Sequence, residues 1–164
     1  MSIRGLIDET LEKIHENRAQ KINLIWLEAT GCSGDILSFL NTYEPDMLYF
    51  LKEMVNLRFC PSIMFPEGSR AFEEFLDTLD TDFILGVEGA VSSINGGAYT
   101  IVASYNGKDI SAAEAISLAA PIAKHIISIG TCAAFGGISA ARPNPSQCMS
   151  LEAYTGKKTI NVPG

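Results

Sequence analysis

Positive charge is scarce in this sequence, and long apolar runs are absent. Lysine and arginine together number 12, against 19 aspartate and glutamate residues, for a formal net charge of −7. Proteins that bind nucleic acid need a basic stripe that neutralises phosphates, so we expect no nucleic-acid partner. No stretch approaches the ~20 apolar residues that cross a bilayer, so we also expect no transmembrane segment.

A recognisable export signal is missing from the N-terminal stretch as well. MSIRGLIDETLEKIHENRAQ contains neither the apolar core of a signal peptide nor a twin-arginine pair. We therefore expect a cytoplasmic protein, and any association with a membrane would be made through its partners.

The sequence has no pair of closely spaced cysteines. Cys32, Cys60, Cys132 and Cys148 are far apart, and no CxxC occurs. Structural zinc sites usually bring their ligands in close pairs, so a zinc site of this kind is disfavoured. In a cytosolic chain of this size, the cysteines are expected to be reduced thiols or metal ligands rather than disulfides.

Histidine is limited to His15 and His125. His15 falls in a predicted N-terminal helix, and His125 falls at the end of a predicted strand that lies away from the ligand-binding loops. A Cys–His pair for nucleophilic catalysis is therefore disfavoured. The stretch GCSGD, which begins at Gly31, also lacks the lysine of a Walker loop and the full dinucleotide fingerprint, which disfavours a phosphate-binding loop.

What the sequence does contain is an alternation of apolar runs with amphipathic segments. Strands are predicted over 22–27, 56–63, 82–90, 125–137 (strand and following turn) and 159–164, helices over 4–18, 35–41, 46–54, 68–79 and 111–124, and a hairpin over 97–110. This alternation predicts the α/β class, with a flavodoxin-like, doubly wound and mostly parallel sheet that has helices on both faces.

Two helix starts carry capping signals. Ser69 is predicted to cap the helix over 68–79, and Ser111 with Glu114 forms a Ser-x-x-Glu capping box. Pro121 is predicted to kink or end the helix over 111–124.

Doubly wound sheets bind ligands beyond the carboxyl ends of their strands. The first predicted strand ends at Glu28 and leads to Cys32, the third leads to Glu88, and the fourth leads to Cys132. Two cysteines with neighbouring glycines are thus expected at one edge of the sheet. Glycine lets the backbone approach a bulky inorganic group, and thiolates there are typical ligands of an iron–sulfur cluster. The alternative is that both are core thiols without a function.

Four stretches together resemble the small, electron-transfer subunit of nickel–iron hydrogenases: IWLEATGCSGDILSFLN, GVEGAVS, IGTCAAFGGISAARPNPSQ and TINVPG. The resemblance covers about residues 20–164. It implies an N-terminal helical extension over 1–20 and, over 21–164, a flavodoxin-like domain that holds the proximal iron–sulfur cluster. The resemblance also implies that the C-terminal domain with the family's other clusters would lie outside the sequence as given. The implied partners are a large subunit with the nickel–iron centre and a downstream electron acceptor. The chain itself supplies no catalytic centre, because it has no pair of CxxC motifs for nickel.

The resemblance also implies the ligands of the cluster. Cys32 and Cys132 match two family ligands. The first ligand position is Ala29 here, and the fourth cysteine of the family would follow Gly164. For the sequence as given we therefore expect a four-iron cluster to be absent or incomplete. In a longer parent we expect a 4Fe–4S cluster or a 3Fe–4S cluster.

Asp35 is the replacement that the resemblance implies for the missing cysteine. Family members without the first cysteine carry Cys-x-Gly-Asp, in which the aspartate is a ligand. A carboxylate oxygen is a harder donor than a thiolate and can complete an iron site. The alternative is that Asp35 caps the following helix. The loops around these ligands contain Gly31, Gly34, Gly130 and Thr131.

Four further residues have open roles. Glu28 and Glu88 match family glutamates, and each is expected either to take part in proton transfer or to support the loop. Cys60 is either a surrogate ligand or a buried thiol, and Cys148 is either structural or exposed.

Two alternative functions stay open. The first is a cluster-free fragment that acts only as a folded domain for binding the large subunit. The second is a relative of the 20-kDa-type subunit of respiratory complex I, although that family carries tandem cysteines in its first loop and TGCSGD has one.

Overall fold

The computed structural model describes residue 5 and residues 21–164. Almost all of the helix expected over 4–18 and of the extension expected over 1–20 lies outside the described residues. Within the part of the chain that the structure describes, no helix is long and apolar enough to cross a membrane.

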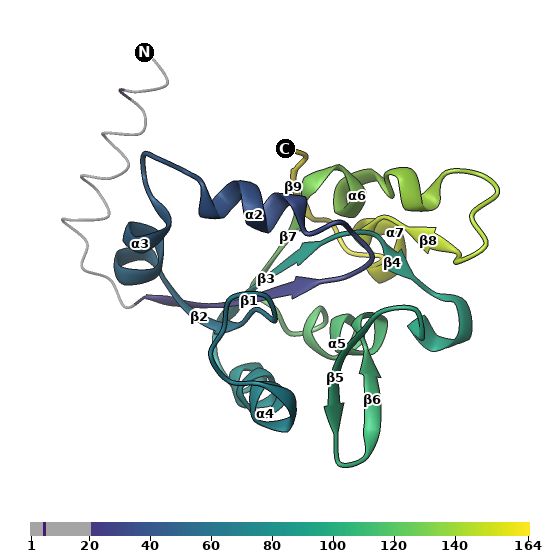
Figure 1. The fold of residues 1–164 in the computed structure, drawn as a ribbon, viewed down its shortest axis with the longest axis horizontal. Helices are drawn as coiled ribbons and strands as arrows, with labels where there is room; N and C mark the ends of the chain where they lie inside the picture. Colours follow the sequence, from purple (N-terminus) through teal and green to yellow (C-terminus); the bar gives the residue numbers. More distant parts are fainter. Residues whose placement is uncertain (1–4, 6–20) are drawn as a thin grey trace.

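A five-stranded parallel sheet runs through the centre of the molecule (Figure 1). Its strands are β1 (Ile22–Glu28), β2 (Val55–Phe59), β3 (Phe83–Glu88), β7 (His125–Ile129) and β9 (Ile160–Val162). They are arranged in the order β2-β1-β3-β7-β9, and every pairing is parallel. This is the flavodoxin-like order 2-1-3-4-5 when only the strands of this sheet are counted. The predicted fold class is therefore confirmed.

Helices cover both faces of the sheet. In the view of Figure 1, α2 (Gly34–Leu40) and α6 (Gly130–Phe135) lie above the sheet, while α4 (Gly68–Leu79) and α5 (Ala112–Ala119) lie below it. The remaining elements are α3 (Met47–Tyr49), η1 (Phe50–Met54), β4 (Val91–Ser92), η2 (Ile94–Gly97), β5 (Ile101–Tyr105), β6 (Lys108–Ser111), η3 (Ile138–Ala140), β8 (Cys148–Met149) and α7 (Leu151–Thr155).

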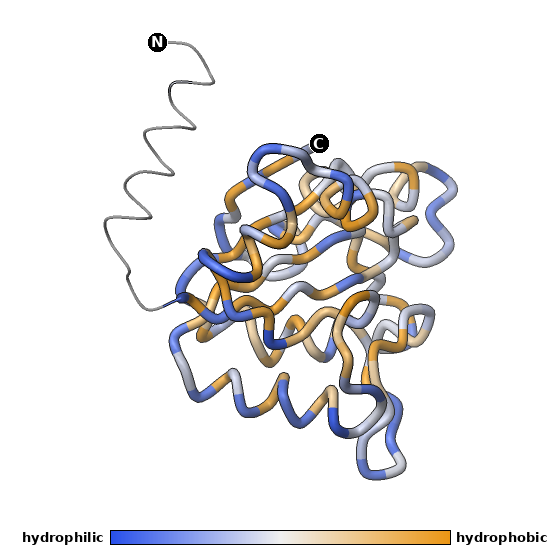
Figure 2. The backbone as a smooth tube through the Cα atoms, turned by 60° about the vertical axis from the view of Figure 1, so that its left-hand side comes forward, coloured by the Kyte–Doolittle hydropathy of each residue, from blue (hydrophilic) through white to orange (hydrophobic). Residues whose placement is uncertain are grey.

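Successive residues of β1 enter two different cores, because side chains alternate across a strand. Ile25 and Leu27 belong to the larger core, whereas Leu24 and Trp26 belong to the smaller core beneath α2. Both faces of this strand are apolar, which explains why its sequence is a continuous apolar run. Figure 2 shows the same layering, with hydrophobic strands inside and hydrophilic segments outside.

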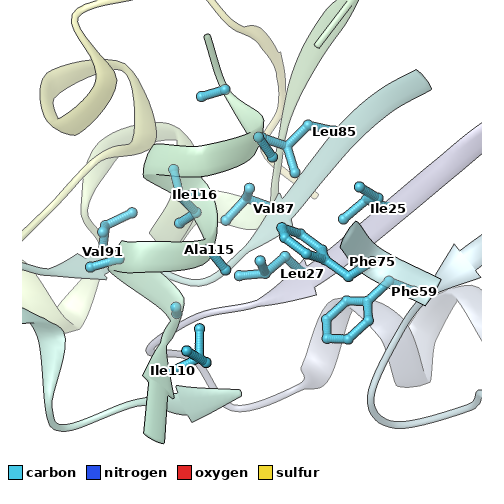
Figure 3. Close-up of a cluster of buried hydrophobic side chains, with 14 of the residues drawn as sticks. Ile25, Leu27, Phe59, Phe75, Leu85, Val87, Val91, Ile110, Ala115 and Ile116 are labelled. Carbon is cyan, nitrogen blue, oxygen red and sulfur yellow. The ribbon is translucent and has the colours of Figure 1, made fainter. Parts of the chain in front are cut away.

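The larger core fills the space between the sheet and the helices α4 and α5 (Figure 3). Phe75 of α4 is fully buried and packs against Phe59 of β2 and Phe72 of its own helix, with ring centroids 5.3 and 5.1 Å apart. From α5, Ile116 is also fully buried in this cluster. Closely packed aromatic rings of this kind contribute strongly to stability.

The four carboxyl ends of the central strands are aligned in one row. Glu28 pairs with Glu88, Glu88 with Ile129, and Ile129 with Val162. We call these four residues the terminal row. Because each strand ends at this row, the loops that follow β1 and β3 and the helix α6 that follows β7 all begin at the same level of the sheet.

Several local predictions are confirmed. Asn106 and Gly107 form the turn between β5 and β6, and both have positive φ, at 51° and 76°. This is the conformation that a two-residue hairpin turn favours. The Ser111 side chain accepts a hydrogen bond from Glu114 N at 3.0 Å, as the capping box predicts, and α5 ends before Pro121.

Two local predictions and one alternative are wrong. The N-cap of α4 is Glu67, and the Ser69 hydroxyl instead donates to Ser104 O. The stretch after β7 is the helix α6 rather than a turn, because Gly130 adopts a φ of 79° and sets a new chain direction directly after the strand. The alternative that Asp35 caps α2 is wrong, because the N-cap of this helix is Ser33.

Phe75→Ala is expected to lower the free energy of unfolding by about 3–5 kcal/mol, because it leaves a cavity beside Phe59 and Phe72. Phe65→Ala is the matched control, since the Phe65 side chain is 98% exposed. It should change the free energy of unfolding by less than about 0.5 kcal/mol. Denaturant unfolding of both variants measures the difference, and equal effects would contradict the assigned core.

Candidate functional site

The loop that follows β1 is fastened to the end of β3 by main-chain hydrogen bonds. Ala29 N donates to Glu88 O at 2.7 Å, and Thr30 and Ala90 exchange two hydrogen bonds of 2.9 Å. Gly89, with φ of 92°, leaves no room for a side chain, since an added Cβ would lie 2.8 Å from the Thr30 carbonyl carbon. The two loops therefore leave the terminal row in direct contact.

Asp35 lies between the start of α6, which follows β7 directly, and the segment after β9. Its carboxylate occupies the space that a Cβ at Gly130 would need, and an added Cβ at Gly164 would lie 3.6 Å from Asp35 Oδ1. Thr131 Oγ1 donates to Pro163 O at 2.8 Å and joins the two segments. Glycine at position 130 thus admits a carboxylate to the carboxyl edge of the sheet.

Both predicted cysteine ligands follow carboxyl ends of the sheet. Cys32 is exposed in the loop after β1, and Cys132 is partly exposed in the first turn of α6. Each sulfur lies close to a glycine. A Cβ added to Gly34 would lie 3.0 Å from Cys32 Sγ, and a Cβ added to Gly137 would lie 2.5 Å from Cys132 Sγ. The expectation that both cysteines sit at one edge agrees with the topology.

The described residues contain no group of three His, Cys, Asp or Glu side chains that would hold a single metal ion. The protein ligands of an iron–sulfur cluster bind different irons, so they lie farther apart than the ligands of one ion. Cys32, Asp35 and Cys132 each lie beside a glycine at the carboxyl edge, and the described residues do not gather them into a site for one metal ion.

Glu88 is buried, with 3% of its surface exposed, and both of its carboxylate oxygens accept hydrogen bonds. Oε1 accepts from Asp35 N at 3.0 Å, and Oε2 accepts from Ile36 N at 3.1 Å and from Trp26 Nε1 at 3.2 Å. Burial raises the pKa of the Glu88 carboxyl, while these three hydrogen bonds act in the opposite direction by stabilising the carboxylate. Of the two expected roles for Glu88, the geometry matches support of the loop.

Glu28 supports a different loop. Its carboxylate accepts from Ser62 N at 3.0 Å and from Ser62 Oγ at 2.7 Å, in the segment that follows β2. The expected hydrogen bonds to the loop that carries Cys32 are therefore made by Glu88 and not by Glu28. Glu28 ties the loop after β2 to the terminal row.

The other two cysteines are buried. Cys60 is fully buried in the smaller core, and this burial, reinforced by the negative charge of Glu28, raises the pKa of its thiol to about 12. Cys60 is therefore a neutral thiol near neutral pH. Cys148 is held by Asn144, whose side chain bonds to both Cys148 N and Cys148 O, which supports the structural role.

Two residues in adjacent strands, Trp26 and Glu88, are matched in their bonding needs. Trp26 lies two residues before Glu28 in β1, on the face of the sheet that α2 covers. Its ring is buried, so its Nε1 needs a hydrogen-bond partner. Glu88, at the end of an apolar strand, is the carboxylate that supplies this partner. A buried indole and a strand-end carboxylate from adjacent strands could have predicted their contact.

Comparison with known families gives one match that covers most of the chain. The family described as NADH ubiquinone oxidoreductase, 20 Kd subunit, matches residues 32–164. This family is named after the respiratory complex I subunit, which is one of the two alternative functions given above. The individual relatives are named as hydrogenase small subunits.

Two curated relatives are hydrogenase subunits. The periplasmic NiFeSe hydrogenase small subunit of Desulfomicrobium baculatum is 32% identical over 159 residues, which cover 89% of this chain and 50% of the relative. The periplasmic NiFe hydrogenase small subunit of Solidesulfovibrio fructosivorans is 33% identical over 87% of this chain and 44% of the relative. The chain thus spans about half the length of these relatives. Its own cytoplasmic location stays a prediction.

Solved structures show the same likeness. A chain of the NiFeSe hydrogenase from Desulfovibrio vulgaris Hildenborough superposes with a TM-score of 0.84 at 30% identity, covering 89% of this chain and 54% of that one. A chain of the actinobacterial-type NiFe-hydrogenase from Ralstonia eutropha H16 gives 0.77 at 25% identity, covering 88% and 48%. The protein belongs to the family described as NADH ubiquinone oxidoreductase, 20 Kd subunit, and its resemblance to nickel–iron hydrogenase small subunits is confirmed.

Proposed function

We propose that this chain is the electron-transfer subunit of a nickel–iron hydrogenase complex and carries the proximal iron–sulfur cluster at the carboxyl edge of its sheet. The observation that carries the proposal is the placement of Cys32, Asp35 and Cys132 in the segments that follow the terminal row: Cys32 in the loop after β1, Asp35 in the first turn of α2 and Cys132 in the first turn of α6. In this role the cluster relays electrons between the nickel–iron centre of a large subunit and a downstream acceptor. In this role the chain is a subunit of an enzyme complex, and the large subunit supplies the catalytic centre.

The donor set suits an iron–sulfur cluster. Cys32 and Cys132 supply thiolates, which are the usual cluster ligands, and Asp35 supplies an oxygen that can complete an iron site. Four irons each need one protein ligand, and these residues supply three. They would hold a three-iron cluster, or a four-iron cluster with one further ligand.

Exposed apolar side chains around the edge support a partner subunit. Phe65, Tyr99 and Ile138 are 98%, 66% and 87% exposed, and they belong to segments that follow β2, β3 and β7. Large apolar side chains in contact with water are typical of protein interfaces. A large subunit that covers them would also shield the cluster from solvent.

A second candidate function is that of the complex I subunit after which the matched family is named. The family match over residues 32–164 favours it. The single cysteine in the loop after β1 and the hydrogenase names of the relatives disfavour it. The third candidate, a cluster-free docking domain, is distinguished from both by iron and acid-labile sulfide analysis of anaerobically purified protein.

Removal of a thiolate ligand is expected to abolish cluster binding. Cys32→Ala and Cys132→Ala should each reduce the iron and sulfide content of the purified protein to near zero, because each removes a thiolate that would bind an iron of the cluster. Asp35→Asn should lower it less and change the electron paramagnetic resonance spectrum. Cys148→Ala, which removes a thiol outside the edge, is the control and should keep its iron. Equal iron content in all four variants would contradict the proposed ligands.

Alkylation should distinguish thiols that a bound cluster protects from a thiol that burial protects. At pH 8, iodoacetamide is expected to modify Cys32 and Cys132 in iron-depleted protein and to spare them in cluster-loaded protein. Cys60 should stay unmodified in both until the chain unfolds, because it is buried and its pKa is about 12, so the reactive thiolate is scarce. Mass spectrometry of the peptides identifies the modified cysteines. A rate of Cys32 alkylation that does not depend on bound iron would contradict the proposal that Cys32 is a cluster ligand.

A further inference from the structure

The first turn of α2 lacks the usual local cap. Ser33 is the N-cap, but its φ is 56° and its side chain makes no capping hydrogen bond. The first N–H groups of a helix have no partner within the helix, and a serine or aspartate side chain usually supplies one. Here the partner comes from another strand, because Glu88 of β3 accepts from Asp35 N and Ile36 N.

The capping carboxylate is itself fixed in place. Trp26 Nε1 donates to Glu88 Oε2 at 3.2 Å, and the Trp26 ring is stacked on Phe39 of α2 with ring centroids 5.4 Å apart. The Glu88 backbone is held in the terminal row by β1 on one side and β7 on the other. Side chain and main chain together leave Glu88 little freedom.

We propose that Glu88 is a positioning residue that fixes the first turn of α2 and thereby the place at which Asp35 presents its carboxylate. The same residue whose N–H binds Glu88 Oε1 carries the carboxylate that lies against Gly130. That the Asp35 carboxylate binds a cluster rests on the proposed function. That Glu88 fixes the first turn of α2 rests only on its hydrogen bonds to Asp35 N and Ile36 N.

Glutamine cannot replace Glu88 in this role. The carboxylate has only acceptor oxygens, and they receive three N–H donors. A glutamine has one oxygen and one amide NH2 group. If its oxygen keeps Trp26 and Ile36, its NH2 group faces Asp35 N, so the hydrogen bond at the proposed ligand is the one that is lost.

The test compares Glu88→Gln with Glu28→Gln in the full protein purified from its complex. Glu28 is the matched control, since it belongs to the same row but binds Ser62 instead of α2. Hydrogen exchange at the main-chain amide of Asp35, which loses its hydrogen bond, should be at least about tenfold faster in Glu88→Gln and unchanged in Glu28→Gln. Trp26→Phe, which keeps the ring and removes the donor, should give a smaller acceleration.

The cluster spectrum supplies the second readout. Glu88→Gln should shift the electron paramagnetic resonance signal in the same direction as Asp35→Asn, while amide exchange in β1 and β3 stays slow. Unchanged exchange at the main-chain amide of Asp35 in Glu88→Gln would overturn the proposal, whatever the iron content. Faster exchange with an unaltered spectrum, in protein where Asp35→Asn does alter it, would overturn the positioning of Asp35. If no variant contains iron, the proposed function fails, and exchange still decides the role of Glu88.

Discussion

The alignment of four parallel strands in the terminal row is the constraint on which the rest of the structure depends. Because Glu28, Glu88, Ile129 and Val162 stand in register, the loops after β1 and β3, the helix α6 and the segment after β9 begin at one level. A shift of one residue in any strand would turn its side chains to the other face and move its loop along the sheet. Cys32, Asp35 and Cys132 are brought to one edge by this alignment, although about 100 residues of sequence separate the two cysteines.

The sheet could be predicted because its strands are buried on both faces. INLIWL and FILGVE are continuous apolar runs, and this pattern is typical of parallel strands between helices. The helix α6 could not be predicted from its composition. GTCAAFGG is rich in small residues and glycine, and it folds as a short helix only because Gly130 turns the chain at the end of β7.

The candidate site was predictable in its residues but not in its contacts. Cys32, Asp35 and Cys132 follow strand ends in the sequence, so their common edge follows from topology. Which glutamate supports which loop depends on side-chain direction, and the pattern of apolar residues does not contain this information. The burial of Glu88 beneath α2 follows from Trp26, which lies on the same face of the adjacent strand.

The most direct test of the account is a Mössbauer spectrum of the protein purified anaerobically with its complex after growth on ⁵⁷Fe. The account predicts iron in sulfur-bridged sites, with one site that differs from the others because an oxygen of Asp35 replaces a thiolate sulfur. This distinct site should disappear in Asp35→Cys, where all protein donors become sulfur. A spectrum without iron in sulfur-bridged sites would contradict the claim that the carboxyl edge of this sheet holds a cluster.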